Sequence, residues 1–528
     1  MKKTLYIIAA ALIALCSCTK QEMPEKAVSN GEMQKIYARV NIGTKLAFTD
    51  NNPGISTVWE ADDSFKAIQD GTTIVTFTLD SGEGTTEGIF STTAEGVTES
   101  TRWQAVLGSA ATEESNELHC GFMGQDGTLA GLKQYTYAHG FSTGTEPSFN
   151  FDDGKLAYIL RVKLPAGVKC IEYTPCGWYK VSDTGGVETQ YLNTSEENDY
   201  GASKTSTITL SSVSAANDFV YIAIPCLDYS RTYQTYNGNK QNGNLRTGVI
   251  ITLLNNTSAN ANASNGTVFE QNVSSEAKVT TLDLSGMTLY RRALLSEAIN
   301  YSKSSEQTIS WSSGIKQKAS SVNTYWSPFN VGSSSNTDPG IYFAFGDLTE
   351  TRTVYSFVNY EMRHKTDGTN NRNDVLSNQR YGGSNTTFYS VVGSRYDIAR
   401  VKWGVDWRMP YSIEIFTLWN GGSTASVTGG VNHTCSANSK TLFIPNSGVK
   451  AHKDDGTNKY TTEYDSNNTP RFWTGDKNQR SASNGGWDEA ETYGTALGYA
   501  TGDYWRRPEY IGMPIRPVHA SSTVAFVN

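Results

Sequence analysis

Alternating apolar and polar residues recur through the first half of this chain, and they constrain its fold more than any other feature. Between Lys35 and about Gly286, apolar side chains repeatedly occupy every second position. This alternation gives a β-strand one face for a core and one face for water, as in the two layers of a β-sandwich. The clearest runs are Ile36, Ala38, Val40 and Ile42; Val75, Phe77 and Leu79; Leu156, Tyr158, Leu160, Val162 and Leu164; and Val220, Ile222 and Ile224.

Turn-rich stretches separate these runs and indicate how the first half is divided. Residues 80–84 and 183–186 are rich in Gly, Asp and Ser or Thr, which favour turns. The span from 35 to 290 suits two sandwich subdomains, predicted at 35–145 and 146–290. Residues 255–275 are rich in Asn, Ser and Ala and read most simply as a long surface loop.

The character of the sequence changes near residue 290. Eight of the eleven tryptophans lie after residue 300. A Ser- and Lys-rich stretch at 291–320 precedes this part and reads either as a linker or as early strands. A third domain is therefore predicted at 321–520, and the fold class is mainly β with an α+β domain at the C-terminal end.

Helix signals occur only in this last part. Asp397 is suited to cap a helix over 398–403 that Gly404 ends. A second helix is predicted to begin near Pro410, with Ser412 as its cap, and to end at 421–422, where two glycines follow each other.

The first eighteen residues form an export signal. Lys2 and Lys3 precede an apolar run over 5–15, which is too short to span a bilayer and ends at Leu15-Cys16-Ser17-Cys18. The pattern resembles a bacterial lipobox, which implies cleavage before Cys18, lipid attachment to that cysteine and stable membrane anchoring by several acyl chains. An ordinary secretory signal with two incidental cysteines is the alternative.

Residues 19–34 are polar and read as a flexible tether. Glu22 and Glu25 follow the lipid site closely, and acidic residues there resemble the surface-export signal of Bacteroidota lipoproteins. The resemblance implies a lipid anchor in the outer membrane, with the protein on the cell surface or in a fimbrium.

Charge and cysteine content limit the partners and the crosslinks. Lys and Arg number 44 against 52 Asp and Glu, so the chain has no basic footprint and nucleic acid is not expected as a partner. Five cysteines follow the leader, and they match no zinc template. One or two disulfides and buried thiols both remain open for these residues, which are Cys120, Cys170, Cys176, Cys226 and Cys435.

Loose motifs in the first half resemble the fimbrillin family of type V pilus subunits and their accessory lipoproteins. They are the segments 44–48 (TKLAF) and 57–63 (TVWEADD), the strand that runs into Pro225, and 279–284 (VTTLDL). The resemblance implies transthyretin-like β-sandwiches and assembly with other pilus subunits by strand donation. Cleavage at Arg39 or Lys45 would open the acceptor groove, although basic residues are also ordinary in strands and turns.

Five motifs in the last part keep the order found in the Fibrobacter succinogenes major paralogous domain, which the region 320–518 resembles. They are the segments 326–332 (WSPFNVG), 340–346 (GIYFAFG), 397–410 (DIARVKWGVDWRMP), 442–448 (LFIPNSG) and 515–518 (IRPV). The resemblance implies a C-type-lectin-like fold. Tyr411 departs from the usual Thr, and Phe472-Trp473-Thr474 departs from the usual Tyr-Trp-Ser-Ser.

The sequence lacks the common catalytic and metal-binding motifs. The sequence contains no nucleophile elbow, phosphate loop, zinc-binding His-Glu-x-x-His or dinucleotide fingerprint, and its six histidines lack ligand spacing. We therefore expect no enzyme and no cofactor. Residues 454–458 and 465–468 offer oxygen donors for calcium without the EF-hand order, so polar turns are the simpler interpretation.

Aromatic residues between 471 and 510 are the ligand-binding candidates. An exposed indole or phenol ring beside a carboxylate can hold a sugar by stacking and hydrogen bonding. Core packing is the simpler interpretation of the tryptophans. The candidates are Trp473, Trp487, Tyr493, Tyr504, Trp505, Asp476 and Asp488.

These observations favour a surface lipoprotein that acts in cell adhesion, as a fimbrial tip or accessory adhesin whose last domain binds a glycan or a protein on a host surface. The alternative is an outer-membrane lipoprotein that captures glycans for nutrient uptake and never joins a pilus. A hydrolase is a third hypothesis, because paired carboxylates can lie anywhere in a chain of this length.

Overall fold

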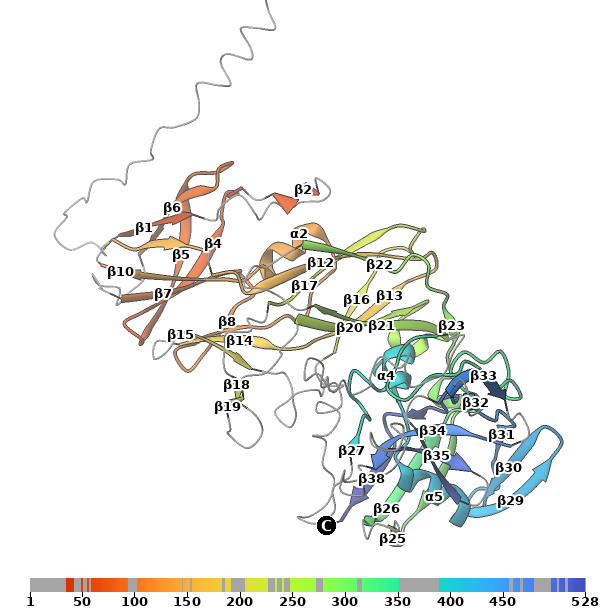
Figure 1. The fold of residues 1–528 in the computed structure, drawn as a ribbon. Coiled ribbons are helices and arrows are strands. Elements are labelled where there is room, and N and C mark those ends of the chain that lie inside the picture. The colour runs from red at the N-terminus through yellow and green to blue at the C-terminus, as the bar shows by residue number, and fades with distance from the viewer. Residues whose placement is uncertain are drawn as a thin grey trace, which may run out of the picture.

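The structure is a computed structural model, and Figure 1 shows its described elements as an elongated body. A first sheet lies at one end, a sandwich lies in the middle and a mixed module lies at the other end. The signal segment, Cys18 and the tether lie outside the described residues. The structure describes residues 35–41, 49–50, 55–56, 58–93, 102–144, 146–151, 154–182, 186–190, 205–226, 233–234, 240–241, 247–271, 279–310, 316–350, 389–454, 459–465, 469–478, 495–500, 503–508 and 511–527.

The first sheet has seven strands in the order β10-β7-β4-β5-β6-β1-β11. Ile36, Ala38 and Val40 alternate along β1 and are buried in a core with Phe65 and Phe77. The alternation therefore forms a one-sided strand, as the sequence predicts. The strands are β1 (Ile36–Asn41), β4 (Ser64–Gln69), β5 (Thr73–Ser81), β6 (Glu87–Thr92), β7 (Arg102–Leu107), β10 (Ala138–Thr143) and β11 (Ser148–Asn150).

Strands from both predicted subdomains form the next sheet, in the order β15-β14-β9-β8. Val106 and Leu118 from the first subdomain share a buried cluster with Val181 and Ala223 from the second. The two spans predicted at 35–145 and 146–290 are thus joined by a common core. The elements here are β8 (Thr112–Glu114), β9 (Glu117–Cys120), α2 (Leu129–Leu132), η1 (Lys133–Tyr135), β14 (Trp178–Ser182) and β15 (Gly186–Gln190), with the two-stranded sheets β2 (Thr49–Asp50) with β3 (Ile55–Ser56) and β18 (Tyr233–Gln234) with β19 (Lys240–Gln241).

The middle of the body, here called the second sandwich, packs a three-stranded sheet (β17-β12-β22) on a five-stranded sheet (β16-β13-β20-β21-β23). Leu160 and Val162 of β12 meet Ile171 of β13 and Ile251 of β20 in its core. The elements are β12 (Ala157–Lys163), β13 (Cys170–Pro175), β16 (Ser206–Thr209), β17 (Phe219–Pro225), β20 (Thr247–Leu254), η3 (Ser258–Asn260), β21 (Ala263–Gln271), β22 (Val279–Asp283) and β23 (Tyr290–Arg291).

The loop predicted at 255–275 is wrong in part, because residues 263–271 form strand β21, which pairs with β20 from Ser264 to Gln271. Its small residues serve close packing on one face. A Cβ atom placed on Gly266 would lie 1.8 Å from the carbonyl oxygen of Val401, in a helix of the C-terminal part. Only glycine permits that approach.

The last part, here called the C-terminal module, spans residues 295–526 and combines helices with several small sheets. Residues 299–303 and 307–310, for which linker and strand were both open, are strands that pair with β26. The elements are η4 (Leu295–Glu297), β24 (Ile299–Lys303), β25 (Gln307–Ser310), β26 (Lys316–Trp326), β27 (Tyr389–Ser390), α4 (Ile398–Trp403), β28 (Trp407–Arg408), α5 (Ser412–Asn420), β29 (Gly422–Val427), β30 (Gly430–Cys435), β31 (Thr441–Pro445), β32 (Lys450–Asp454), β33 (Lys459–Asp465), β34 (Phe472–Asn478), β35 (Thr495–Ala500), β36 (Asp503–Pro508), β37 (Val518–His519) and β38 (Thr523–Phe526).

The first predicted helix is confirmed as α4. The Asp397 side chain accepts a hydrogen bond from the backbone N–H of Arg400 at 3.0 Å, and Gly404 ends the helix with φ at 89°. Left-handed backbone of this kind favours glycine. None of the described helices combines the length and the apolar character that crossing a membrane requires.

The second predicted helix is confirmed as α5, but its capping differs from the prediction. Ser412 is the first helical residue, and Tyr411 is the N-cap. The Tyr411 N–H donates to the Glu414 carboxylate at 2.8 Å, and the Ser412 N–H donates to Asp476 at 2.6 Å. A carboxylate from β34 therefore satisfies the first N–H of the helix, in place of the capping by Ser412 that the sequence predicts.

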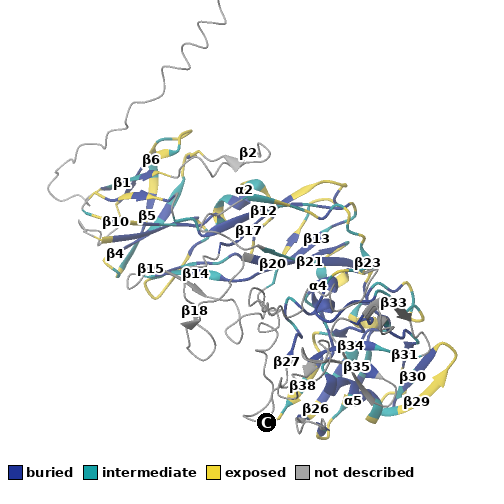
Figure 2. Ribbon diagram, in the orientation of Figure 1, coloured by how far each residue is buried: buried dark blue, intermediate teal, exposed yellow. Residues whose placement is uncertain are grey.

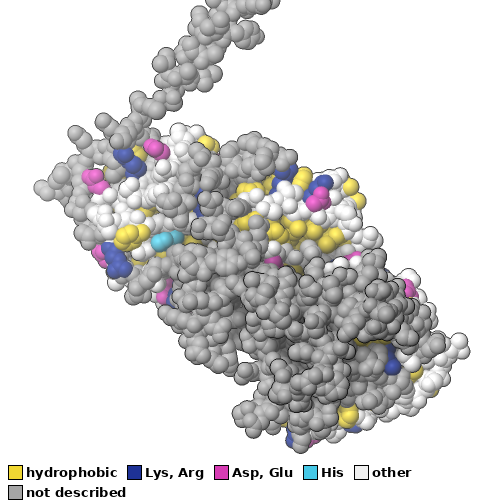
Figure 3. Space-filling view, viewed as in Figure 1, with side chains coloured by type: hydrophobic (Ala, Val, Ile, Leu, Met, Phe, Trp, Pro, Cys, Tyr) yellow, Lys and Arg dark blue, Asp and Glu magenta, His cyan; other side chains and the backbone are white. Residues whose placement is uncertain are grey.

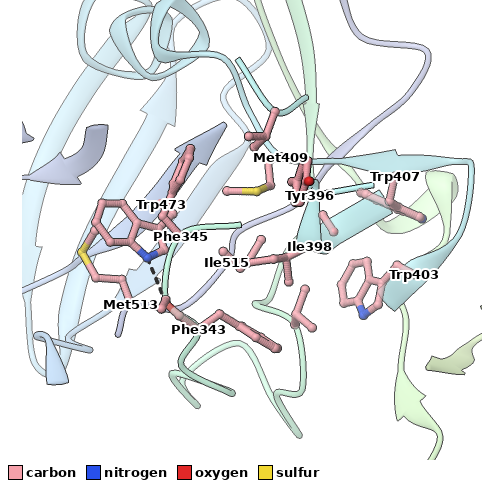
Figure 4. Packing of buried hydrophobic residues seen from close by; sticks show 14 of the residues in the cluster. Phe343, Phe345, Tyr396, Ile398, Trp403, Trp407, Met409, Trp473, Met513 and Ile515 are labelled. Atoms are coloured by element: carbon pink, nitrogen blue, oxygen red, sulfur yellow. Dashed lines mark hydrogen bonds between the residues drawn. The ribbon is translucent and has the colours of Figure 1, made fainter. Parts of the chain in front are cut away.

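Tryptophan packing holds the C-terminal module together (Figure 4). Trp403, Trp407 and Trp473 lie in one buried cluster, and the rings of Trp403 and Trp407 meet edge to face at 5.3 Å between centroids. The Trp473 indole donates to the carbonyl oxygen of Phe343 at 3.0 Å. Figure 2 shows the contrast between this interior and β29, whose residues are almost all exposed.

All five cysteines that follow the leader are buried thiols in the structure. Of the two interpretations left open by the sequence, this is the one the structure adopts. Burial raises the pKa of the Cys170 and Cys176 thiols to about 12, which keeps both protonated at neutral pH.

Candidate functional site

Helix α4 fastens the C-terminal module to the second sandwich (Figure 1). Val401 packs against Ile250 and Cys176 on the five-stranded sheet. Its carbonyl oxygen lies in the last turn of the helix, where it lacks a helical partner, and accepts a hydrogen bond from the Thr252 hydroxyl at 2.7 Å. The closeness that Gly266 permits is therefore used for a specific polar contact.

Charged side chains of the second sandwich hold the chain just after α4. Glu172 is 1% exposed, accepts from the Val405 N–H at 2.8 Å and also accepts from the Ser258 hydroxyl. Arg292 is 2% exposed and pairs with Asp406 at 2.7 Å. Removing one member of such a pair leaves a buried charge without compensation, so these contacts resist separation of the two parts.

Arg400 adds a third contact from the other side of α4. Its side chain is buried, and one terminal nitrogen donates to the hydroxyls of Thr174 and Thr205, each at 2.8 Å. The two threonine hydroxyls also share a hydrogen bond at 2.6 Å. Together these contacts fix both the position and the rotation of α4 on the sheet.

A cavity of about 590 Å³ opens beside this contact, between β21 and the C-terminal module. Lys402 lies in its wall and donates to Glu350 at 2.6 Å, to the carbonyl oxygen of Gly266 at 3.0 Å and to Asn265 at 3.3 Å. Burial lowers the pKa of Lys402, and the Glu350 carboxylate opposes that shift. The ammonium group therefore uses all three of its N–H bonds to hold the wall of the cavity.

A second ion pair lies in the same wall. Glu270 of β21 pairs with Arg395 of the C-terminal module, and Arg395 also donates to the Tyr396 hydroxyl at 2.7 Å. Asp347 contributes a buried carboxylate that accepts from the Thr349 N–H at 2.9 Å. The cavity thus presents polar groups of both signs, most of them already held in place.

Two of the residues predicted to bind a ligand have structural positions instead. Trp473 is fully buried and donates its indole N–H inside the core, so its ring has no face for a sugar. Asp476 is also fully buried; it accepts from the first N–H of α5, and burial raises its pKa. For these two residues the core interpretation replaces the ligand-binding one.

The remaining predicted residues are only partly covered by the structure. Trp487, Tyr493 and Asp488 lie outside the described residues. Tyr504 and Trp505 belong to β36, whose side-chain positions are not described. The proposed calcium turns at 454–458 and 465–468 lie outside the described residues except for Asp454 and Asp465, which end β32 and β33.

The two predicted processing sites differ in position. Arg39 lies inside β1, half-buried, and its backbone N–H donates to the carbonyl oxygen of Pro147 at 3.0 Å. Lys45 lies outside the described residues, between the end of β1 at Asn41 and the start of β2 at Thr49.

Sequence reasoning did not predict the residues around the cavity. Lys402, Glu350 and Glu270 come from three separate segments, and no spacing pattern connects them. One signal was present: Lys402 sits in a short helix between Val401 and Trp403, and charged residues inside such an apolar run are seldom buried without a partner.

Comparison with known proteins gives distant likenesses only. The sequence matches no protein-family model and no curated protein. A crystal structure from Bacteroides ovatus, named as a "putative cell adhesion protein", aligns over 49% of this chain and 95% of its own, with 14% identity and a TM-score of 0.27. A structure of the same name from Bacteroides uniformis aligns over 48% of this chain and 94% of its own, again with 14% identity and a TM-score of 0.27.

Proposed function

We propose that this protein is a lipid-anchored lipoprotein of the bacterial cell surface that acts in adhesion, with the C-terminal module as its ligand-binding end. The observation that carries the proposal is the fixed attachment of that module to the second sandwich through α4, Glu172, Arg292 and Arg400. A module held by buried polar contacts keeps its orientation and transmits a pulling force to the anchored part of the chain, which adhesion requires.

The anchor follows from the lipobox that ends at Cys18. In an adhesin of this kind the lipid attaches the end that precedes β1, and Figure 1 places β1 at the opposite end of the body from α5. The C-terminal module then points away from the membrane. In the view of Figure 3, the described Lys, Arg, Asp and Glu side chains are scattered among uncharged ones.

Assembly into a fimbrium by strand donation has a concrete basis in the first sheet. Strand β1 lies between β6 and β11 and pairs with both. Its loss would expose two strand edges and the core positions of Ile36, Ala38 and Val40. Cleavage after Lys45 would release all of β1, whereas cleavage after Arg39 would cut inside a paired strand. We therefore favour Lys45 as the processing site.

A position at the tip is supported by the other end of the chain. Strand β38 pairs with β26 inside the C-terminal module, so it is engaged and not available to a neighbouring subunit. In this proposal the subunit accepts a strand from a neighbour and does not donate β38. Co-purification with sheared fimbriae would support assembly, and mass spectrometry of the surface form would test processing: an N-terminus still at Cys18 would exclude it.

The second candidate function is glycan capture for nutrient uptake without assembly. The cavity beside Lys402 supports this second function, because a polar cavity of about 590 Å³ suits a soluble ligand as well as a ligand on a host surface. A capture protein should remain with outer-membrane vesicles and bind soluble polysaccharide.

The experiment that tests adhesion uses the whole ectodomain, residues 19–528, because a fragment that begins at 291 would expose the buried face of α4. We expect the ectodomain to bind glycans on an array or immobilised mucin. Trp487→Ala and Trp505→Ala test the aromatic candidates separately. Absence of binding to any glycan or host-surface preparation would contradict the proposal.

A further inference from the structure

The cavity between β21 and the C-terminal module has the features of a built ligand site. Its volume of about 590 Å³ lies within the roughly 300–1,000 Å³ typical of small-molecule sites. Three of its polar side chains are almost fully buried: Asn265 is 2% exposed, Lys402 is 3% exposed and Asp347 is 4% exposed. Polar side chains are seldom buried to this degree unless they are hydrogen-bonded.

The charges around the cavity argue against an anionic ligand. Lys402 is paired with Glu350, and Arg395 is paired with Glu270. Asp347 adds one more carboxylate, so the wall carries no surplus of positive charge that would attract a phosphate or a carboxylate. Among the described residues no cluster of three metal-ligating side chains was found here or elsewhere. Neutral polar groups are what this wall can pair with.

The arrangement of donors and acceptors favours hydroxyl groups. Lys402 holds one oxygen of Glu350, and Asn265 donates from its amide to the carbonyl oxygen of Thr288 at 3.0 Å. The second oxygen of Glu350 is not used by Lys402 and can accept from a ligand hydroxyl. Thr267 contributes a further hydroxyl to the lining. A carboxylate oxygen beside amide and hydroxyl groups is the combination that binds vicinal diols.

Apolar side chains complete the lining. Val268, Met287 and Leu348 border the same cavity as the polar groups. A sugar ring has a hydroxyl rim and an apolar C–H face, and it can use both kinds of wall at once. A simple ion or a purely aliphatic molecule would leave one kind unmatched.

We infer that this cavity binds a neutral saccharide unit, and that it is a glycan site of the protein separate from the aromatic residues at 487–505. The inference rests on the proposed adhesive function and adds a location and a ligand class to it. Lys402 acts as a positioning residue, because its three N–H bonds already go to protein atoms. Asn265 is likewise engaged, with Lys402 and with the Thr288 carbonyl oxygen, so recognition comes from Glu350 and Thr267.

Gly286 offers a way to block the cavity without disturbing its wall. It lines the cavity, and a Cβ atom placed on it meets no other atom within 4 Å. Gly286→Trp should therefore fold normally and fill the space with an indole, whereas Gly286→Ala should leave room for a ligand. Gly121 has the same open surroundings far from the cavity, so Gly121→Trp is the matched control.

The test measures binding of neutral monosaccharides and disaccharides to the whole ectodomain by calorimetry, with inorganic phosphate and a uronic acid as charged probes. We expect neutral sugars to bind, Gly286→Trp to weaken binding by about tenfold or more, and Gly286→Ala and Gly121→Trp to bind as the wild type does. Bound sugar should slow hydrogen exchange in β21 and in residues 346–350. Thermal unfolding of each variant checks that it is folded.

The other outcomes separate the two proposals. Glycan binding that is unchanged in folded Gly286→Trp would overturn the cavity site and leave adhesion standing, with the ligand bound elsewhere. Binding of phosphate or uronic acid in preference to neutral sugars would overturn the ligand class. If the protein mediates cell adhesion but its ectodomain binds no sugar, only the cavity site is overturned. If it neither mediates adhesion nor binds sugar, both the cavity site and the adhesive function are overturned.

Discussion

Replacing Gly266 by Ala should loosen the attachment of the C-terminal module. The new Cβ atom would lie 1.8 Å from the Val401 carbonyl oxygen and 2.9 Å from the Ile251 carbonyl oxygen. Both atoms belong to the backbone, so no side-chain rotation can relieve the contact. Ordinary contact begins at 3.4 Å, and α4 must therefore move away from β21 by about 1.6 Å.

The cost follows from the hydrogen bonds that such a movement breaks. The Thr252 hydroxyl donates to Val401 at 2.7 Å, and the Lys402 ammonium donates to the Gly266 carbonyl oxygen at 3.0 Å. Stretching either by about 1.6 Å removes it. Each broken hydrogen bond that leaves a buried group unsatisfied costs about 1–3 kcal/mol, so we expect the two to cost about 2–6 kcal/mol in total. Alanine also lowers the conformational entropy of the unfolded chain relative to glycine, which reduces this destabilisation by about 0.4–1 kcal/mol.

Calorimetry and hydrogen exchange measure the effect. In the wild type, the second sandwich and the C-terminal module should unfold together, and the amides of α4 should exchange slowly. In Gly266→Ala, the C-terminal module should unfold at a lower temperature and α4 should exchange faster. Gly121→Ala is the control, because a Cβ atom there meets nothing within 4 Å. Unchanged unfolding and exchange in Gly266→Ala would refute the reasoning.

Three further predictions concern single residues. Glu414→Gln should destabilise the C-terminal module by about 3–5 kcal/mol in chemical denaturation, because the buried charge of Arg408, paired with Glu414 at 2.7 Å, loses its partner. The control is Asp283→Asn, which removes the charge of the exposed pair with Lys163. Similar costs for the two variants would contradict the prediction. His433 is buried, and burial lowers its pKa from the usual 6.5 to about 4. The unfolded state therefore binds more protons between these pH values, and the free energy of unfolding should fall by about 3 kcal/mol as the pH drops from 6.5 to 4. Urea denaturation at several pH values checks this, and His433→Gln should lose that part of the pH dependence; an identical pH profile in the variant would refute it. Cys18→Ala should abolish labelling by radioactive fatty acid and sensitivity to globomycin, and persistent labelling would exclude this lipid site.

Local patterns predicted the elements whose signals lie within a few residues. The alternation of Ile36, Ala38 and Val40 predicted β1, and Asp397 with Gly404 predicted both ends of α4. These features are encoded in adjacent positions, because strand periodicity and helix capping depend on neighbours in the chain.

Features that depend on distant contacts were not predictable in the same way. The first N–H of α5, on Ser412, donates to Asp476, which lies 64 positions further along the chain. The small polar residues of β21 favour a loop in the sequence. One of them, Gly266, is required because Val401, far along the chain, packs directly against its backbone. Around the cavity, the contact between Lys402 and Glu350 joins residues 52 positions apart. A single sequence carries no local trace of such pairs.

The most direct test of the whole account is adhesion by living cells. Isogenic strains that produce the wild type, Cys18→Ala or no protein would be compared for attachment to mucin-coated surfaces under flow, with the soluble ectodomain as competitor. The account predicts that only wild-type cells attach strongly and that added ectodomain releases them. Equal attachment of all three strains, with no effect of the competitor, would contradict it.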